Sequence, residues 1–389
     1  MIRKLLLVII GLSIGLGVGY LTATKYPAVS LSSNIDTLVH NPLALFKPKV
    51  IGFLPYWLVD KAKKDYSKTI SNLTYFSLTI DSDGKLLKLL NDTEEEPGWN
   101  ALHSGRMDEH FENAKKSNID LSLTLFNGNE ESIGELISDP IPHARNLAKE
   151  IDPIMKRYEF KEVNLDIESV KEASGEARSN FTAFIKEFKK NLDEKNLGAL
   201  TIDASPTIFI RKYLINPKEI EPYIDHMVIM AYDYHYPTSI VTGPVAPLGG
   251  AGIVSEFDTQ VGVQAALNMI PAHKLILGIP LYGYEWETIA DMPRSVVIPG
   301  SGQTASGSRI EKLIEECASC SSGLEKEAVE RYVTFKDDEV GTYHQIYYPD
   351  DHVTQSKIDL ARKNNLGGLA LWALGYEDST ILEPISAYK

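Results

Sequence analysis

Residues 160–168 read Phe-Lys-Glu-Val-Asn-Leu-Asp-Ile-Glu, and apolar and polar side chains alternate from Val163 to Glu168. The alternation has the period of a β-strand, so the apolar side chains share one face. Asn164, Asp166 and Glu168 then share the other face, roughly 7 Å apart at each step of two residues. Burying a row of acid and amide groups costs free energy, which indicates that they serve a function. We interpret Glu168 as a catalytic carboxylate at the end of the strand and Asp166 as its partner one pleat below. A half-exposed strand with a hydrated polar face is the alternative, because such short patterns are common.

The composition of the chain is that of a globular protein, with 43% hydrophobic and 24% charged residues among 389. This length suffices for one large domain or two ordinary ones. The net charge of −14 argues against nucleic acid as a partner, because a polyanion would be repelled. A neutral or cationic substrate fits the charge better.

The amino terminus predicts a targeting segment. Arg3 and Lys4 precede an apolar run that ends near Leu21, close to the minimum length that spans a bilayer. We expect residues 1–24 to form a signal anchor or a cleaved signal peptide, and residues 25–48 to form a linker. Either form would place the rest of the chain outside the cytoplasm, anchored to the cell membrane or secreted.

Short apolar runs of the kind found in strands covered on both faces recur from residue 50 onward. The candidate strands are Val50–Leu54, Leu73–Ile80, Asp120–Phe126, Val163–Glu168, Ala199–Ala204, His226–Tyr232, Lys274–Leu281 and Gly368–Trp372. Amphipathic helical stretches, such as 144–158 and 181–192, separate several of them. This alternation predicts an α/β protein, a (β/α)8 TIM barrel over residues 49–389. A doubly wound sheet is the alternative, but no glycine-rich phosphate loop follows the first strand.

The interval between the seventh and eighth strands is too long for one crossover helix. It contains a Gly/Ser-rich piece at 300–308, a helical stretch at 309–317, and strand-like runs at 331–335 and 344–348. We therefore expect a small α+β insertion over about residues 285–348.

The only two cysteines, Cys317 and Cys320, lie in this insertion. No histidine lies close enough in sequence to complete a zinc site with them, and no strand–turn–helix pattern of a redox centre surrounds them. A local disulfide or two free thiols is the expected state.

The carboxyl ends of the strands line the active site of such a barrel. Those ends carry Tyr56, Trp57, Glu168, Tyr232, Asp233, Tyr234, His235, Tyr282, Tyr284, Glu285, Trp286 and Trp372. The set is rich in carboxylates and aromatic rings and poor in metal ligands. Aromatic rings stack on the C–H faces of sugars, and carboxylates perform acid–base chemistry at acetal carbons. The composition of this rim suggests a glycosidase.

Five segments, taken in order, resemble the strand motifs of glycoside hydrolase family 18, the chitinase-like barrels. Residues 160–168 resemble the fourth-strand signature F-D-G-x-D-x-D-x-E, and residues 230–233 match the sixth-strand M-x-Y-D. The other similar segments are 52–57, 277–283 and 367–372, and the run 243–248 is similar to a bacterial branch that includes spore-cortex and cell-wall glucosaminidases.

Three residues of the fourth-strand signature depart from the family pattern. Lys161 and Glu162 replace the usual Asp and Gly, and Asn164 replaces the innermost Asp. Asn164 can still form a hydrogen bond with Asp166. Because one like charge is removed, we expect the carboxylate cluster to ionise more easily and the pH optimum to be shifted.

The resemblance implies a retaining mechanism in which the 2-acetamido oxygen of the substrate attacks C1. Glu168 would then be the general acid and base, Asp166 would orient the acetamido group and stabilise the positive intermediate, and Tyr232 would donate to the acetamido carbonyl. The implied substrate contacts are Trp372 as the floor of the −1 site, with Asp233, Tyr282, Trp57 and Asn164 as further candidates. The implied substrate is a glycan that contains N-acetylglucosamine, either chitin-like or peptidoglycan, and no metal ion or cofactor is implied.

Two other functions are compatible with the same residues. One is a retaining glycosidase with two protein carboxylates, Glu168 as the acid and Glu285 as the nucleophile. The other is a non-catalytic, lectin-like barrel, since several relatives have lost the catalytic acid. The presence of Glu168 argues against the lectin-like alternative.

Overall fold

A computed structural model describes residues 48–317 and 319–389 of the chain. The predicted signal segment, and the predicted linker up to residue 47, lie outside these ranges. In the part that is described, every helix is too short or too polar to cross a lipid bilayer.

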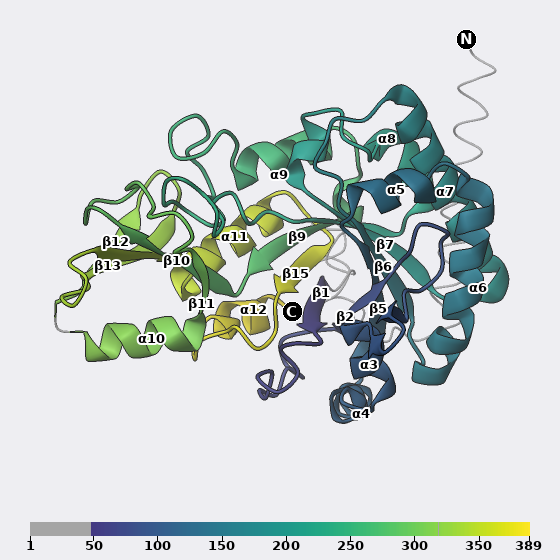
Figure 1. The fold of residues 1–389 in the computed structure, drawn as a ribbon, viewed down its shortest axis with the longest axis horizontal. Coiled ribbons are helices and arrows are strands. Elements are labelled where there is room, and N and C mark those ends of the chain that lie inside the picture. The colour runs from purple at the N-terminus through teal and green to yellow at the C-terminus, as the bar shows by residue number, and fades with distance from the viewer. Residues whose placement is uncertain (1–47, 318) are drawn as a thin grey trace, which may run out of the picture. The chain divides into compact units, whose positions relative to one another are not determined.

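The described chain is built on a closed barrel of eight parallel strands (Figure 1), in the order β1-β15-β9-β8-β7-β6-β5-β2. The strands are β1 (Lys49–Pro55), β2 (Asn72–Thr79), β5 (Asp120–Asn127), β6 (Glu162–Ile167), β7 (Ala199–Ala204), β8 (His226–Ile229), β9 (Leu275–Pro280) and β15 (Gly368–Trp372). Each coincides with one of the predicted strands to within a few residues. The prediction of a (β/α)8 barrel is therefore confirmed. The largest difference is β8, which ends at Ile229 because the chain leaves the sheet at Met230.

Helices cover the outside of the barrel, with α5, α6 and α7 on the side away from the insertion (Figure 1). The helices are α3 (Pro97–His103), α4 (Asp108–Lys116), α5 (Glu130–Leu136), α6 (Pro140–Tyr158), α7 (Gly175–Lys195), α8 (Pro217–Ile220), α9 (Thr259–Leu267), α11 (Asp351–Lys363) and α12 (Leu382–Tyr388). Short 3₁₀ turns span Pro206–Phe209, Glu221–Tyr223 and Ala272–Lys274. Both helical stretches predicted from amphipathic spacing fall within α6 and α7. Their apolar faces are buried, as Leu147 and Phe184 illustrate.

The alternation of residues 163–168 places its two faces as predicted. Val163, Leu165 and Ile167 belong to the large core between the barrel and its helices. Asn164 and Asp166 point into the barrel and are 0% and 3% exposed. The alternative of a hydrated polar face is therefore wrong, because closure of the barrel removes that face from solvent.

The inside of the barrel also holds a small apolar cluster, made of Ile51, Phe53, Phe76, Val228, Ile276 and Ala370. These six residues come from β1, β2, β8, β9 and β15. The inward-facing acids Glu162, Asp166 and Asp203 come instead from β6 and β7, so apolar and acidic groups are contributed by different strands.

The insertion between β9 and β15 is a five-stranded antiparallel sheet in the order β11-β10-β14-β13-β12. Its elements are β10 (Tyr282–Thr288), β11 (Gln303–Ser306), α10 (Gly307–Glu316), β12 (Ser321–Glu325), β13 (Glu330–Lys336) and β14 (Tyr343–Tyr348). The sequence indicated α10, β13 and β14. It did not indicate β10, β11 or β12, which are short, polar or directly continuous with β9. Cys317 and Cys320 form a disulfide just after α10.

Candidate active site

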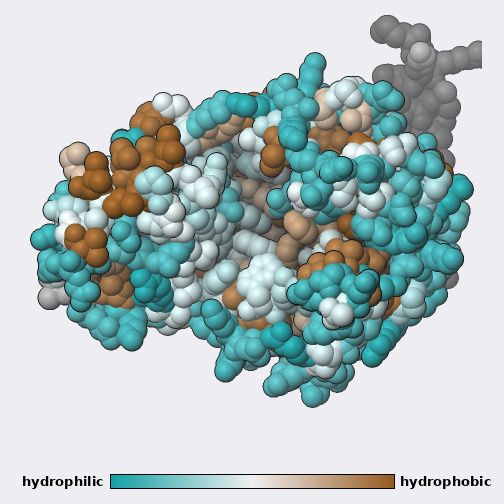
Figure 2. All heavy atoms as spheres, viewed as in Figure 1, coloured by the Kyte–Doolittle hydropathy of each residue, from teal (hydrophilic) through white to brown (hydrophobic). Residues whose placement is uncertain are grey.

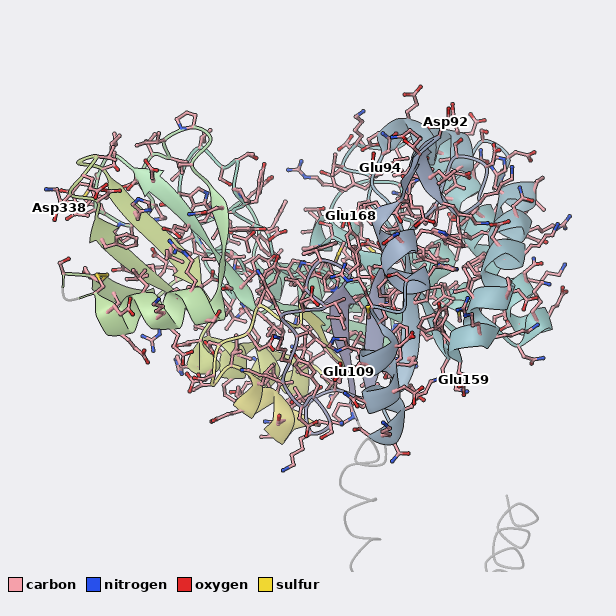
Figure 3. The ribbon with its side chains drawn as sticks, turned by 60° about the horizontal axis from the view of Figure 1, so that its bottom comes forward. Asp92, Glu94, Glu109, Glu159, Glu168 and Asp338 are labelled. Atoms are coloured by element: carbon pink, nitrogen blue, oxygen red, sulfur yellow. A yellow bond between two sulfur atoms is a disulfide. The ribbon has the colours of Figure 1, made fainter. Side chains whose placement is uncertain are left out.

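A column of polar residues follows β6 from the amino end of the barrel to its mouth. Asn164 and Asp166 are buried inside, and Glu168 stands one residue beyond the end of β6 with an exposed side chain. Figure 3 shows Glu168 at the opposite end of the barrel from Glu159, the residue that closes the helix before β6. Glu168 therefore lies at the carboxyl edge of the strands, where barrel enzymes place their catalytic groups.

A second acid, Asp203, enters the column from the neighbouring strand. Asn164 pairs with Thr201 in the parallel register of β6 and β7, and Leu165 pairs with Ile202. Continuing this register puts Asp203 beside Asp166 on the inner face, since inward-facing residues alternate along both strands. Asp203 is 3% exposed, and its Oδ1 accepts a hydrogen bond of 3.0 Å from Nδ2 of Asn164.

Sequence reasoning missed Asp203, although the signal was present. The strand Ala-Leu-Thr-Ile-Asp-Ala alternates with the same period of two as residues 163–168. Thr201 and Asp203 could therefore have been assigned to its inner face. Their neighbours in space could not be assigned, because these depend on the register between β6 and β7.

The surface is hollowed between the insertion and the helix-covered side of the barrel (Figure 2). At the mouth of the barrel, Glu168, Asp203 and Met230 line a small cavity of about 60 Å³. A larger cavity of about 700 Å³ lies beside α4, between Tyr66 and His110, and none of the residues at the strand ends lines it. Of the two cavities, the smaller one therefore adjoins the candidate site, through Glu168 and Asp203.

The acids of this column resist ionisation. Burial raises the pKa of Asp166 well above its ordinary value, and the charges of Glu168 and Asp203 add to the rise. Burial likewise raises the pKa of Asp203 to about 8, although the hydrogen bond from Asn164 opposes the rise. The pKa of Glu168 is also raised, first by loss of hydration and then by the charge of Asp233. At neutral pH this group therefore holds protons that ordinary carboxyl groups would have released.

This result corrects the expectation that Asn164 makes the cluster easier to ionise. The expectation counted only the acids of β6. The third carboxyl group is supplied by Asp203 from β7, so the like-charge repulsion that Asn164 removes is restored.

Tyr232 lies next to the same acids. Burial raises the pKa of its hydroxyl well above the ordinary value, and the charges of Asp203, Asp166, Asp233 and Glu168 raise it further. Its ring lies close to β9: a Cβ atom at Gly278 would come within 2.6 Å of the carbonyl oxygen of Ile229 and 2.9 Å of Cε1 of Tyr232. The absence of a side chain at Gly278 thus leaves room for β8 and for the ring of Tyr232, whose neutral hydroxyl is available as a donor.

Asp233 is held by two tyrosines from the insertion. The hydroxyl groups of Tyr282 and Tyr284 donate to its Oδ1 at 2.5 and 2.9 Å. Its backbone has φ +59°, a left-handed conformation that non-glycine residues rarely adopt and that is common at functional sites. Both donors occupy Oδ1, so Oδ2 is left for a ligand. Tyr282 is only 3% exposed, and its hydroxyl supports Asp233 through this hydrogen bond.

Trp372 ends β15 and packs against aromatic rings at the mouth of the barrel. Its ring centroid lies 4.7 Å from Phe76, 5.7 Å from Phe53 and 6.4 Å from Trp57. Trp57 is 45% exposed, which leaves one side of this cluster open to a ligand. Phe53 and Phe76 were not among the predicted site residues, because a phenylalanine in an apolar strand carries no signal that separates it from ordinary core.

Glu285 was predicted to lie at the mouth of the barrel, and the structure places it elsewhere. It lies on β10 in the insertion sheet, where Nε and Nη2 of Arg309 donate to its two oxygens at 2.8 Å each. His344 lies 2.9 Å from Oε1. Burial opposes ionisation, but the hydrogen bonds from His344 and Arg309 hold the pKa of Glu285 below its ordinary value. A carboxylate bound in this way has no free oxygen to act as a nucleophile, which argues against the two-carboxylate alternative.

The two other departures from the family signature lie at the amino end of β6. Lys161 is exposed. Glu162 points into the barrel, where it forms an ion pair with Lys49 and accepts a hydrogen bond of 2.6 Å from the hydroxyl of Thr201. Glu162 is thus neutralised locally. Among residues 48–317 and 319–389, no group of three or more His, Cys, Asp or Glu side chains is arranged to hold a metal ion.

Comparison with known proteins agrees with this geometry. The family model of glycosyl hydrolases family 18 matches residues 49–377. The chain belongs to this family. The match runs from β1 to the segment after β15, so it includes Glu168, Asp166, Tyr232 and Trp372 and spans the insertion sheet as well. As a member of family 18, the chain is a glycosidase.

The curated relatives come from bacteria, animals and a plant. The chain is 25% identical over 319 residues to the putative sporulation-specific glycosylase YdhD of Bacillus subtilis, covering 80% of this chain and 67% of the relative. It is 26% identical over 255 residues to the cortical fragment-lytic enzyme of B. subtilis, covering 63% and 53%. It is 24% identical over 279 residues to probable chitinase 2 of Drosophila melanogaster, covering 67% and 56%. This family 18 chain thus spans between about half and two thirds of these relatives.

Solved structures share the fold. The group IV chitinase of Ostrinia furnacalis in complex with allosamidin gives a TM-score of 0.73 at 17% identity, covering 88% of this chain and 97% of that one. The Cycas revoluta chitinase in complex with (GlcNAc)3 gives 0.72 at 20% identity, covering 87% and 99%. The spore cortex-lytic enzyme SleL of Bacillus megaterium gives 0.67 at 18% identity, covering 87% and 73%.

Proposed function

We propose that this chain hydrolyses β-1,4-linked glycans that contain N-acetylglucosamine, with retention of configuration. The observation that carries the proposal is Glu168, which stands at the mouth of the barrel two residues after the buried Asp166. Family membership supports glycoside hydrolysis, and the likeness to a chitinase in complex with (GlcNAc)3 supports the choice of sugar.

Glu168 would act first as the acid and then as the base. Its raised pKa favours the protonated carboxyl group, which can protonate the leaving oxygen. The acetamido oxygen of the substrate would attack C1 at the same time, since family 18 relies on substrate assistance instead of a protein nucleophile. The ionised Glu168 would then take a proton from the water that opens the intermediate.

Asp166 and Tyr232 would hold the acetamido group for this attack. The hydroxyl of Tyr232 stays protonated and would donate to the acetamido carbonyl oxygen. Asp166 would accept from the acetamido N–H. Its ionised form becomes favourable as positive charge develops on the ring that the acetamido group closes, since an adjacent opposite charge favours a carboxylate.

The aromatic cluster would bind the sugar rings. Trp372 is braced by Phe53 and Phe76, so its ring offers a rigid apolar floor to the sugar in the −1 site. Trp57, which is exposed, would stack on a neighbouring sugar. Oδ2 of Asp233 would accept a hydrogen bond from a sugar hydroxyl.

We further propose a bacterial cell-wall glycan as the natural substrate. Two of the curated relatives are a sporulation-specific glycosylase and a cortical fragment-lytic enzyme. The signal segment predicted for residues 1–24 would place the enzyme outside the cytoplasm, on the cell membrane or secreted, where such a glycan is found.

Product analysis with purified peptidoglycan and chitin oligomers, side by side, tests the proposal. We expect reducing ends at N-acetylglucosamine from both, faster release from peptidoglycan, and inhibition by a thiazoline derived from N-acetylglucosamine. Binding without turnover would establish the lectin-like barrel instead. Turnover of sugars that lack the acetamido group, with a trapped glycosyl ester, would establish a mechanism with two protein carboxylates.

A further inference from the structure

We propose that Asp203 is a positioning residue that keeps a proton on Asp166 in the resting enzyme, with Asn164 fixing its orientation. The inference rests on the proposed function, because its main readout is the pH dependence of that activity. In this chain β6 carries Asn164 where the family has its innermost acid, so Asp203 on β7 supplies that acid.

The residue at position 164 cannot share a proton. An amide neither gives nor takes a proton at neutral pH, so Asn164 can only donate through Nδ2 and accept through Oδ1. Its Nδ2 is committed to Oδ1 of Asp203 at 3.0 Å. Asp203 is therefore held in one orientation, with an amide dipole and no cation beside it.

Two buried oxygens beside this hydrogen bond have no partner. Among the described residues, Oδ1 of Asn164 and Oδ1 of Asp166 are both buried without a hydrogen bond. Buried polar atoms are rarely left in this state, since each costs about 1–3 kcal/mol. Both atoms are acceptors if Asp166 is ionised, so neither can satisfy the other. A proton on Asp166 turns its carboxyl group into a donor, which the unpartnered oxygen of Asn164 can accept.

Asp203 favours retention of that proton on Asp166. It stands at the level of Asp166, and both are 3% exposed. The charge of Asp203 opposes ionisation of Asp166, since two neighbouring like charges in a barrel interior cannot both be present without a large cost. The ionisable groups that face Asp203 are Glu162, Asp166 and Glu168 from the β6 side, Tyr232 from the segment after β8, and Tyr213 across the small cavity.

Lys49 does not offset this charge. It is bound to Glu162, four residues before Asp166 and toward the amino end of β6. Asp166 and Asp203 thus behave as a pair that shares a proton.

The variant Asp203→Asn removes this charge and keeps the shape. The pKa of Asp166 and Glu168 then falls, so the basic limb of the pH profile of kcat/KM moves to lower pH. We expect roughly tenfold lower kcat/KM at a pH above the wild-type limb and a ratio near one in the acid range, since one pKa unit is a factor of ten. KM should change less than kcat. Asp225→Asn is the matched control, because Asp225 is an aspartate next to β8 that binds Lys189 and the backbone of Leu200.

The double variant Asn164→Asp with Asp203→Asn returns the carboxyl group to β6. If an inner acid is what the site needs, this variant restores the basic limb. A purely structural role of Asp203 predicts no restoration, and an unchanged profile in Asp203→Asn overturns the inference. Absence of turnover in the wild-type enzyme would count against the proposed function itself, so the two failures are distinguishable.

If Asp203→Asn fails to fold, infrared difference spectroscopy of the wild-type protein tests whether Asp166 and Asp203 share a proton. The wild-type protein should retain a carboxylic acid C=O band at neutral pH that is lost at higher pH, when the pair of Asp166 and Asp203 releases its shared proton. Complete ionisation of every carboxyl group by pH 6 would overturn the inference.

Discussion

The barrel mouth and the insertion sheet both bury carboxyl groups, and they treat them in opposite ways. Asp166 in the barrel is 3% exposed and Glu285 in the insertion is 1% exposed. Asp166 faces other acids, and its pKa is raised. Glu285 faces Arg309 and His344, and its pKa is lowered. Burial is thus common to a candidate catalytic acid and to a structural ion pair. The charge of the neighbours decides which of the two a buried acid becomes.

The two regions meet at Asp233. It follows β8 of the barrel, but its Oδ1 is bound by Tyr282 and Tyr284 of β10. The insertion therefore contributes to the site through hydrogen bonds to one barrel residue. An aromatic cluster with Trp286 and Tyr347 at its centre packs against Trp372 and steadies this contact.

The largest expected effect comes from removing the acid at the barrel mouth. Glu168→Gln should lower kcat on N-acetylglucosamine oligomers about 10³-fold, within the range of general acid–base catalysis. Binding should be retained, because the amide keeps the shape and size of the carboxyl group. Steady-state kinetics and calorimetric titration with an oligomer measure the two effects.

Glu172→Gln is the matched control, since Glu172 is exposed in the loop that follows Glu168 and should leave turnover unchanged. Near-wild-type turnover in Glu168→Gln would remove Glu168 from its role.

The second-largest expected effect is a loss of stability when the ion pair between Arg309 and Glu285 in the insertion is broken. Arg309→Met leaves the buried Glu285 with His344 as its remaining partner, and should cost about 2–3 kcal/mol in unfolding free energy. Urea denaturation measures this cost. Lys312→Met on the same helix is the control, because Lys312 is exposed and lies 3.9 Å from Glu316, so its loss should cost under about 0.5 kcal/mol. Equal effects of the two substitutions would mean that Glu285 is not a buried ion-pair partner.

The third expected effect is a gain in unfolding free energy, whereas the second is a loss. The folded state binds protons on Asp166 more tightly than the unfolded state, so this residue lowers stability as pH rises above the ordinary aspartate range. Asp166→Asn should therefore stabilise the protein by about 0.5–2 kcal/mol at pH 7 and abolish activity. Glu285→Gln should destabilise it, by an amount that grows as pH rises toward about 4.5 and stays constant above that value, because the pKa of Glu285 is lower in the folded state than in the unfolded state. Unfolding free energies of the two variants, measured from pH 4 to 8, test both expectations. Parallel pH dependences would mean that the neighbouring charges do not distinguish Asp166 from Glu285.

The smallest expected effect concerns the hydrogen bonds that join the insertion sheet to Asp233 at the barrel mouth. Tyr282→Phe removes one of two donors to Asp233 and leaves Tyr284 in place, which should cost about 1 kcal/mol, or roughly fivefold in kcat/KM. The pKa of Asp233 should rise, because these hydrogen bonds lower it. Tyr332→Phe is a control on the insertion sheet, away from Asp233. No difference between the two variants would mean that Asp233 does not depend on the insertion for its position.

The fold could be predicted because its signals are local. Each barrel strand is a short apolar run, and such runs follow from neighbouring residues. The start of the insertion could not be predicted, since β10 follows β9 after a single residue and both are buried strands. Glu285 was therefore assigned to the end of a barrel strand when it belongs to another sheet.

The sequence alone determined that Asn164, Asp166 and Glu168 share a face, because strand periodicity fixes the direction of side chains two residues apart. Only the tertiary structure decided what that face meets. Asp203 is 37 positions beyond Asp166, and the register of two parallel strands brings it alongside. Charge interactions act through space and not along the chain, so the ionisation of Asp166 depends on that register as much as on its own sequence.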